Sequence, residues 1–196
     1  MDPGPSHYVQ LRWNVGCTSE TYVTGELWKR ATIPACPFHP DGGCGVRSHG
    51  SYPRVRPRGV RVPRFLCPVT GRTISLLPDF LAAQLSSTTA SVEEVVEAAQ
   101  RLGVPAAAEK LRPRTGLQGG QRWVRRRLYP VVAMLCVLQG VFPDLFAGCS
   151  PKEIWSYRGA LGTAVLPALR ELGEPHLQNL IKPLGFHRGT VTHKPP

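Results

Sequence analysis

The feature that most restricts the fold is a group of cysteine and histidine residues in a short segment rich in Gly and Pro. The segment reads Cys36-Pro-Phe-His39-Pro-Asp-Gly-Gly-Cys44, and Cys67 follows after a further stretch of about twenty residues. A turn of this spacing directs soft ligands at one point, and a hairpin can bring a second turn opposite it. Four ligands can then close a tetrahedron around a metal ion, which stabilises a unit with little core of its own. The segment therefore predicts a zinc-ribbon-like unit.

The ligand set that we expect for Zn²⁺ is Cys36, His39, Cys44 and Cys67. The position three residues after Cys67, where a further ligand is expected, has Thr70, and threonine is a poor zinc ligand. His49 and Cys17 are reserve candidates. The alternative is that the site has been lost and that the cysteines are small buried apolar residues. Cys136 and Cys149 are expected to be ordinary core or loop cysteines.

Residue patterns divide the chain near residue 85 into two parts of different class. Apolar residues make up 42% of the 196 residues, which argues against wholesale disorder, and 20 Gly with 20 Pro require many turns. Residues 1–85 are predicted to form a β-rich zinc-ribbon-like domain with short strands at 8–15 and 21–27. Residues 86–186 are predicted to form an all-α domain that starts like a helix-turn-helix unit, and 187–196 a flexible tail. The expected class is α+β.

Capping residues and apolar spacing predict a series of helices in the second domain. The first begins at a capping box, Ser91 to Glu94, and ends at Gly103, a residue type that commonly follows a helix. Proline is expected to end, kink or divide the later helices because it lacks the backbone N–H. A second helix is expected at 106–112, before Pro113, and a third from Gln121, with a kink or a new start at Pro130. Further helices are expected from a second capping box at 150–153, at 161–172 with a kink or a break at Pro167, and at 175–181.

The charge of the chain points to a polyanionic partner. The formal net charge is +11, from 24 Lys and Arg against 13 Asp and Glu, and arginine suits bidentate contacts to phosphate and guanine. Between 55 and 65 Arg alternates with apolar residues or Pro, so a strand pair at a sheet edge or in an open ribbon could present Arg on one face. The expected nucleic-acid contacts are Arg54, Arg56, Arg58, Arg61 and Arg64 in this ribbon, and Arg122, Arg125, Arg126 and Arg127 in the third helix.

The order of the three helices that begin at Ser91 is that of a helix-turn-helix module. In such a module the third helix enters the major groove or lies across phosphates. The stretch before the third helix, 114–120, is longer than the usual turn. Simpler interpretations stay open: a helical bundle with a solvated Arg face, and a solvated strand face in the ribbon.

The chain also resembles a known group, the zinc-ribbon proteins associated with bacterial insertion sequences and transposons, which carry a helix-turn-helix part after the ribbon. The residues that carry the resemblance are Cys36-Pro, Cys44, His49-Gly-Ser-Tyr52, Arg64-Phe-Leu-Cys67-Pro, Thr73-Ile-Ser-Leu-Leu-Pro-Asp79 and Arg122-Trp-Val-Arg-Arg126. The resemblance covers about residues 34 to 130. It implies DNA binding, with transposon ends or a transposase as partners. It departs at Thr70, where that group would have a ligand.

No catalytic motif is evident. The chain has four Asp, none placed to hold the two metal ions of an RNase H-type transposase, and it lacks G-x-S-x-G, P-loop and H-E-x-x-H motifs. The N-terminus has no apolar signal segment, and the longest apolar run, Val131–Leu138, is short of the roughly 20 residues that cross a bilayer, so a cytoplasmic protein without membrane contact is expected. The expected function is a DNA-binding accessory factor or regulator of a mobile element. The alternative is a non-catalytic protein-interaction scaffold with a structural zinc site.

Overall fold

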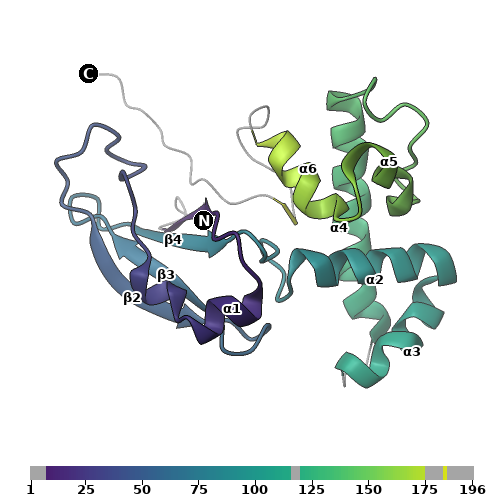
Figure 1. The fold of residues 1–196 in the computed structure, drawn as a ribbon, viewed down its shortest axis with the longest axis horizontal. Coiled ribbons are helices and arrows are strands. Elements are labelled where there is room, and N and C mark those ends of the chain that lie inside the picture. Colours follow the sequence, from purple (N-terminus) through teal and green to yellow (C-terminus); the bar gives the residue numbers. More distant parts are fainter. Residues whose placement is uncertain (1–7, 116–119, 175–182, 185–196) are drawn as a thin grey trace, which may run out of the picture. The chain divides into compact units, whose positions relative to one another are not determined.

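The computed structural model describes residues 8–115, 120–174 and 183–184, and they belong to two compact units. The first unit ends at Leu81 and the second begins at Ala82, slightly before the division expected at residue 85. The first contains a four-stranded sheet with short helices, and the second contains helices (Figure 1). The chain is therefore of the α+β class, as predicted. The expected helix at 175–181 and tail at 187–196 lie outside the described residues.

The sheet of the first unit has the strand order β1-β4-β3-β2. Its strands are β1 (Tyr8–Trp13), β2 (Arg47–Pro53), β3 (Arg61–Leu66) and β4 (Thr73–Pro78). β1 runs parallel to β4, with Tyr8 opposite Thr73, whereas the other neighbouring strands are antiparallel. The strand predicted at the start of the chain is confirmed as β1.

The β2–β3 hairpin is shorter than the ribbon expected from alternation. Residues 54–60 form the loop between the strands, and only 61–66 form the second strand. β2 is an edge strand, as its proline favours, but β3 lies between β2 and β4. Proline is compatible with β3 because β4 pairs only with Arg64–Leu66, beyond Pro63.

Residues 21–27 are helical rather than extended, which corrects the predicted second strand. The two helices here are α1 (Ser19–Thr24) and η1, a 3₁₀ helix (Leu27–Arg30). The Thr18 hydroxyl caps α1 by accepting a hydrogen bond from the Thr21 amide at 3.2 Å. Tyr22 is fully buried and meets the rings of Trp13, Trp28 and Phe80. A side-chain cap and one buried aromatic residue therefore outweigh the strand preference of Thr, Tyr and Val.

The described residues of the second unit contain six helices: α2 (Thr89–Leu102), α3 (Val104–Thr115), α4 (Gly120–Val141), the 3₁₀ helix η2 (Ile154–Tyr157), α5 (Arg158–Leu161) and α6 (Val165–Gly173). α2 begins before the predicted capping box, because the Thr88 hydroxyl accepts the Ser91 amide at 3.1 Å and is the N-cap. Its end at Gly103, with φ +80°, is as predicted.

Proline divides these helices less than predicted. α3 continues past Pro113 to Thr115, so it accommodates one missing backbone hydrogen bond. Pro167 lies in the first turn of α6, where backbone N–H groups have no partner within the helix, so proline removes no helical bond there. α4 continues through Pro130, since burial of its apolar face compensates for one lost bond. α5 ends instead at Gly162, with φ +78°. The second predicted capping box, at 150–153, is followed by the 3₁₀ helix η2 rather than by an α-helix.

The described residues of the second unit include two apolar clusters. One joins α2, α3 and the start of α4 through Val95, Ala99, Ala107, Leu111 and Val124. The other surrounds the second half of α4 and includes residues of α2, η2 and α6. α4 therefore contributes residues to both clusters. Within the described ranges, no helix combines the length and the hydropathy needed to cross a bilayer.

Candidate metal centre and basic surfaces

Two turns present the predicted metal ligands. In the first, the His39 amide donates to the Cys36 carbonyl at 3.0 Å, which folds the two residues back on each other. Gly42 and Gly43 follow with φ of +86° and +79°, a backbone conformation that suits glycine, and lead the chain to Cys44. In the second turn, the Cys67 amide, directly after β3, donates to the Arg72 carbonyl at 3.0 Å.

The four predicted ligands converge. Their ligand atoms all lie within 4.8 Å of one another, and His39 Nδ1 is 3.7 Å from Cys36 Sγ and 3.5 Å from Cys67 Sγ. A tetrahedral zinc ion with bonds of about 2.3 Å to sulfur and about 2.1 Å to nitrogen separates its ligand atoms by about 3.5–3.8 Å. The arrangement therefore fits one metal ion held by three sulfurs and one imidazole.

The ligands lie within the core of the first unit. All three cysteines are buried and pack with Phe65 of β3 and with Ile74 and Leu76 of β4. His39 is half-buried. A metal bound here would connect the two turns to the sheet, so its removal would open the core as well as the site.

Hydrogen bonds favour the thiolate form of one cysteine in this cluster. Burial raises the pKa of Cys67, but hydrogen bonds from the Thr70 hydroxyl and amide and from Cys36 outweigh it and lower the pKa to about 6. For the neighbouring Cys36, burial raises the pKa to about 11. Cys67 is thus the first of the two to become a thiolate, the form that binds metal. The spacing of the sequence marks Thr70 only as a position where a ligand is lacking. Its hydrogen bonds to Cys67, which lower the pKa of that thiol, are visible only in the structure.

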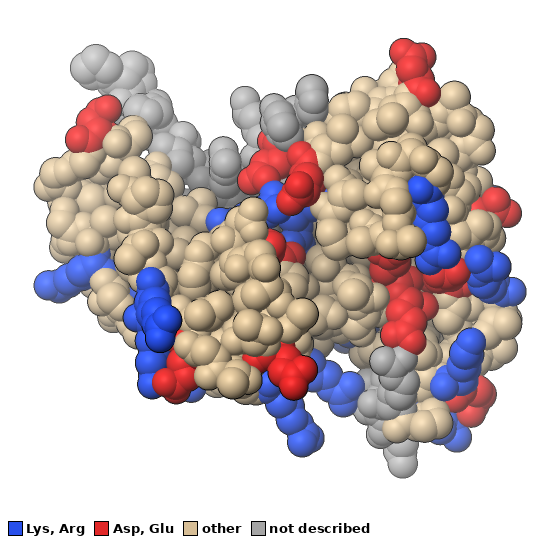
Figure 2. Space-filling model, in the orientation of Figure 1, with Lys and Arg blue, Asp and Glu red and all other residues tan. Residues whose placement is uncertain are grey.

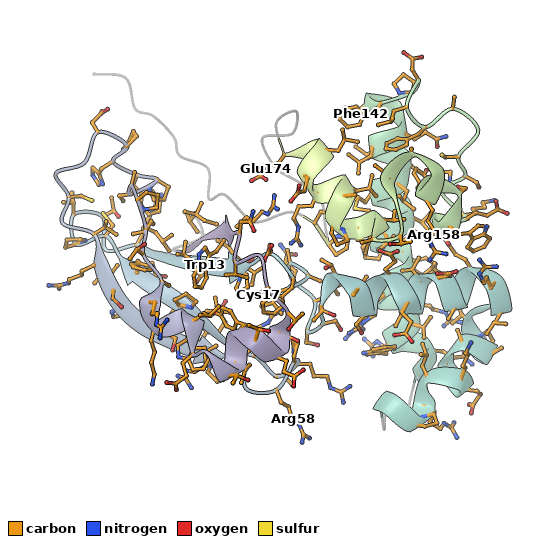
Figure 3. The ribbon with its side chains drawn as sticks, viewed as in Figure 1. Trp13, Cys17, Arg58, Phe142, Arg158 and Glu174 are labelled. Atoms are coloured by element: carbon orange, nitrogen blue, oxygen red, sulfur yellow. The ribbon has the colours of Figure 1, made fainter. Side chains whose placement is uncertain are left out.

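The reserve ligands lie elsewhere. His49 is exposed on β2, and Cys17 lies just before α1 (Figure 3), where it is not part of the cluster formed by the described His, Cys, Asp and Glu residues. Cys149 is half-buried against the second-unit core, whereas Cys136 is exposed on α4. The expectation of an ordinary core or loop position therefore fits Cys149, but Cys136 is a helix-surface residue.

The arginines of the first unit do not form one strand face. Arg61 and Arg64 are three positions apart in β3, so their side chains leave opposite faces of the sheet. Arg61 donates to the Ser51 hydroxyl at 2.9 Å, and the Arg64 guanidinium lies 5.8 Å from the centre of the Tyr52 ring. Both are half-buried. The predicted single Arg face is therefore wrong, because the alternating stretch is mostly loop.

The loop from Arg54 to Val60, here called the basic loop, holds the other predicted contacts of this unit. Arg56 and Arg58 are exposed, whereas Arg54 is half-buried and burial lowers its pKa. Figure 3 shows Arg58 directed away from the fold. Figure 2 shows Lys and Arg side chains projecting at several separate places, with Asp and Glu side chains also on this face.

The predicted arginines of α4 divide into two kinds. Arg122, Arg125 and Arg126 are exposed. Arg127 is only 3% exposed; it donates to the Ser87 hydroxyl at 3.0 Å and to the Trp123 carbonyl at 3.1 Å, and its guanidinium stacks on the Trp123 ring at 3.8 Å. This corrects the prediction for Arg127, whose side chain holds α4 to the start of the second unit rather than facing a partner.

Comparisons of the chain with family models, with curated proteins and with solved structures found no match. The assignment of a function therefore depends on the geometry of the residues described above.

Proposed function

We propose that the chain is a DNA-binding protein, and the observation that carries this proposal is the row of exposed arginines on the first two turns of α4. Arg122, Arg125 and Arg126 are three and four residues apart, so they share one face of the helix. The opposite side is buried at Val124. From 110 to 143 the sequence has no Asp or Glu to neutralise them. Such a face suits contact with a phosphate backbone.

The position of α4 supports the same proposal. It is the third helix after α2 and α3, and the three pack around one apolar cluster, which is the order expected of a helix-turn-helix-like unit. The positive end of the helix dipole at Gly120 adds to the attraction for phosphate. In our proposal the first half of α4 lies in the major groove or across the phosphates beside it. Residues 116–119, within the stretch expected to connect α3 and α4, lie outside the described residues.

The metal in this proposal is zinc with a structural role. Three thiolates and one imidazole are a ligand set that zinc adopts in structural sites, and four protein ligands leave no open position for a substrate. Burial of the cysteines supports the same role. We therefore propose a non-catalytic protein in which the metal maintains the first unit.

The biological setting follows from the resemblance to transposon-associated zinc-ribbon proteins. We propose an accessory factor or regulator of a mobile element, acting in the cytoplasm on transposon ends or together with a transposase. The basic composition of both units supports a polyanionic target in this setting.

A second candidate function is a scaffold that binds proteins. It is favoured by the part of α4 that follows its arginines, where Tyr129, Val137 and Val141 are 61%, 46% and 40% exposed. No charged residue occurs from 128 to 143, and an exposed apolar face of this kind can bind another protein. In this case the positive charge would contribute to solubility only.

The experiment that separates the two candidates is a salt titration of DNA binding by the full, metal-loaded chain, measured by fluorescence anisotropy with a labelled 30-base-pair duplex. Under our proposal, affinity falls steeply with salt, and the double variant Arg125→Ala/Arg126→Ala reduces the slope of log affinity against log salt by about 2. The matched control is Lys29→Ala/Arg30→Ala, which removes two exposed charges from η1 and should leave the slope unchanged. No binding near 100 mM salt would favour the scaffold, and an α4 variant that binds like the parent would refute the role of α4.

A further inference from the structure

The basic loop carries an unusual combination of side chains. Val55 is 79% exposed, more than the other exposed large hydrophobic residues of the described chain, and it lies between two arginines. Arg56 and Arg58 are exposed beside it. From 42 to 78 the sequence has no Asp or Glu. The basic loop therefore places one exposed apolar side chain directly beside exposed cations, in a stretch of sequence without anions.

The loop is held in one conformation by contacts at its base. The Arg54 amide donates to the Val60 carbonyl at 2.8 Å, which closes the loop. Val60 itself is fully buried. Gly59, with φ +80°, packs so closely on α1 that a Cβ there would lie 3.0 Å from a methyl of Val23. The tip is therefore presented by a rigid base, which reduces the entropy lost on binding.

The strand after the loop is anchored as well. The Tyr22 hydroxyl donates to the Arg61 carbonyl at 2.8 Å, and burial raises the pKa of Tyr22, so the hydroxyl keeps its proton. The Arg61 side chain bonds to the hydroxyl and the carbonyl of Ser51 on β2 at 2.9 and 3.1 Å. Both arms of the hairpin are thus fixed beneath the exposed tip.

We propose that the basic loop inserts into the minor groove of duplex DNA at A·T-rich sites, with Arg56 and Arg58 in the groove and Val55 against its wall or between base steps. This inference rests on the proposed DNA binding and adds a second contact to that of α4. The minor groove is about 6 Å wide, too narrow for a helix but accessible to side chains from a loop tip. Narrow A·T-rich grooves have an enhanced negative potential that attracts arginine.

The apolar residue fits the same groove. Proteins that bind in the minor groove frequently combine basic side chains with an apolar wedge placed against a base step. The loop offers both in two adjacent exposed residues, Val55 and Arg56. A site that only tracked phosphates would gain nothing from Val55, whereas a minor-groove site gains contact area from it.

The test uses the full, metal-loaded chain and three labelled duplexes that differ only in eight central base pairs: A·T, G·C or inosine·C. Inosine·C keeps the major-groove pattern of G·C but lacks the 2-amino group in the minor groove. We expect A·T and inosine·C to bind alike, and both about tenfold more tightly than G·C. If the chain binds all three duplexes equally, or binds the inosine·C duplex as weakly as the G·C duplex, the minor-groove proposal for the basic loop is overturned. The proposed DNA binding through α4 would then still stand. Absence of binding to all three would overturn both.

Two variants assign the preference to the loop. Arg56→Ala/Arg58→Ala should reduce the preference for A·T to less than twofold, and Val55→Ser should reduce it without any change of charge. The control Lys29→Ala/Arg30→Ala removes two exposed charges from η1 of the same unit and should keep the full preference. Metal content and circular dichroism show whether each variant is folded. A folded Arg56→Ala/Arg58→Ala protein that still prefers A·T and inosine·C would overturn the proposal.

Discussion

At the scale of single residues, Thr70 contacts the candidate metal centre without supplying a ligand atom. Spacing after Cys67 indicates a ligand at this position, but Thr70 hydrogen-bonds the Cys67 sulfur instead. The fourth ligand atom comes from Cys44, in the first turn. Spacing therefore predicted the candidate residues, whereas their convergence depends on a backbone path that includes two glycines with positive φ, Gly42 and Gly43.

The ligand set leads to a first prediction, on metal content. Cys44→Ser should lower the metal content of the purified chain from about one ion per molecule to a small fraction, because a serine hydroxyl is a poor ligand for zinc. The measurement is elemental analysis by mass spectrometry after gel filtration. His49→Ala is the matched control and should keep the metal, since His49 is exposed on β2. Loss of metal in the His49 variant alone would show that the ligand set is wrong.

A second prediction separates two adjacent arginines of α4. Arg127→Ala should lower the free energy of unfolding by about 1–3 kcal/mol, because it removes buried hydrogen bonds to Ser87 and Trp123 and a stacked ring contact. Arg126→Ala, at an exposed position, should change it by less than about 0.5 kcal/mol. Urea unfolding followed by circular dichroism measures both. Equal effects would contradict the structural role of Arg127.

At the scale of secondary structure, the sequence predicted where helices and strands occur better than it predicted whether a segment is helix or strand and where it ends. The helix end at Gly103 could be predicted because glycine supplies a positive φ there. The helical state of 19–24 could not, because strand propensity dominates that stretch and its deciding contacts, among them Tyr22 against Phe80, involve residues far away in the chain. The passage of α4 through Pro130 was missed for a related reason, since only packing shows that the helix continues to be buried there.

A third prediction concerns an ion pair that ties α2 to α5. Glu97 accepts hydrogen bonds from Arg158 and from Arg101. Burial alone would raise the pKa of Glu97, but these bonds hold it below its usual value. A depressed pKa in the folded state stabilises the protein above the pKa of the unfolded chain, and this stability is lost as pH falls through the folded value. The pair should therefore matter at neutral pH and not in acid.

The corresponding variant is Glu97→Gln. At pH 7 it should lower the free energy of unfolding by roughly 0.5–1 kcal/mol, since the pair is partly exposed, and the difference from the parent should shrink towards zero as pH falls below about 4. Urea titrations at pH 7, 5 and 3.5 measure this. Glu109→Gln, which breaks an exposed pair with Arg112, is the control and should have little effect at any pH. A penalty for Glu97→Gln that is the same at all three values would contradict the assignment.

At the scale of the whole molecule, the two units have separate cores. The cluster around the cysteines belongs to the first unit, and the clusters around α4 belong to the second. The α+β class could be predicted because the change from Gly- and Pro-rich turns to helical spacing is visible in the sequence. The parallel pairing of β1 with β4 could not, since no local pattern indicates which strand a distant segment will join.

A fourth prediction follows from the separate cores. Removal of the metal with a chelator should abolish the protection of backbone amides from hydrogen exchange in residues 8–81, while protection in 82–174 persists, because only the first core contains the ligands. Hydrogen exchange read out by mass spectrometry resolves the two regions. The Cys136→Ser protein, altered at an exposed position of α4, should respond like the parent. Loss of protection in both regions would show that the units depend on each other.

The parallel pair of β1 and β4 also has a consequence for how the chain is made. The paired residues, such as Tyr8 and Thr73, are 65 positions apart, and a ribosome that adds about 5–20 residues per second needs roughly 3–13 seconds to bridge that gap. The first strand to be synthesised is therefore among the last to find its partner. All four candidate metal ligands precede β4 in the chain, so under the zinc-site proposal the nascent protein can bind the ion before its sheet is complete.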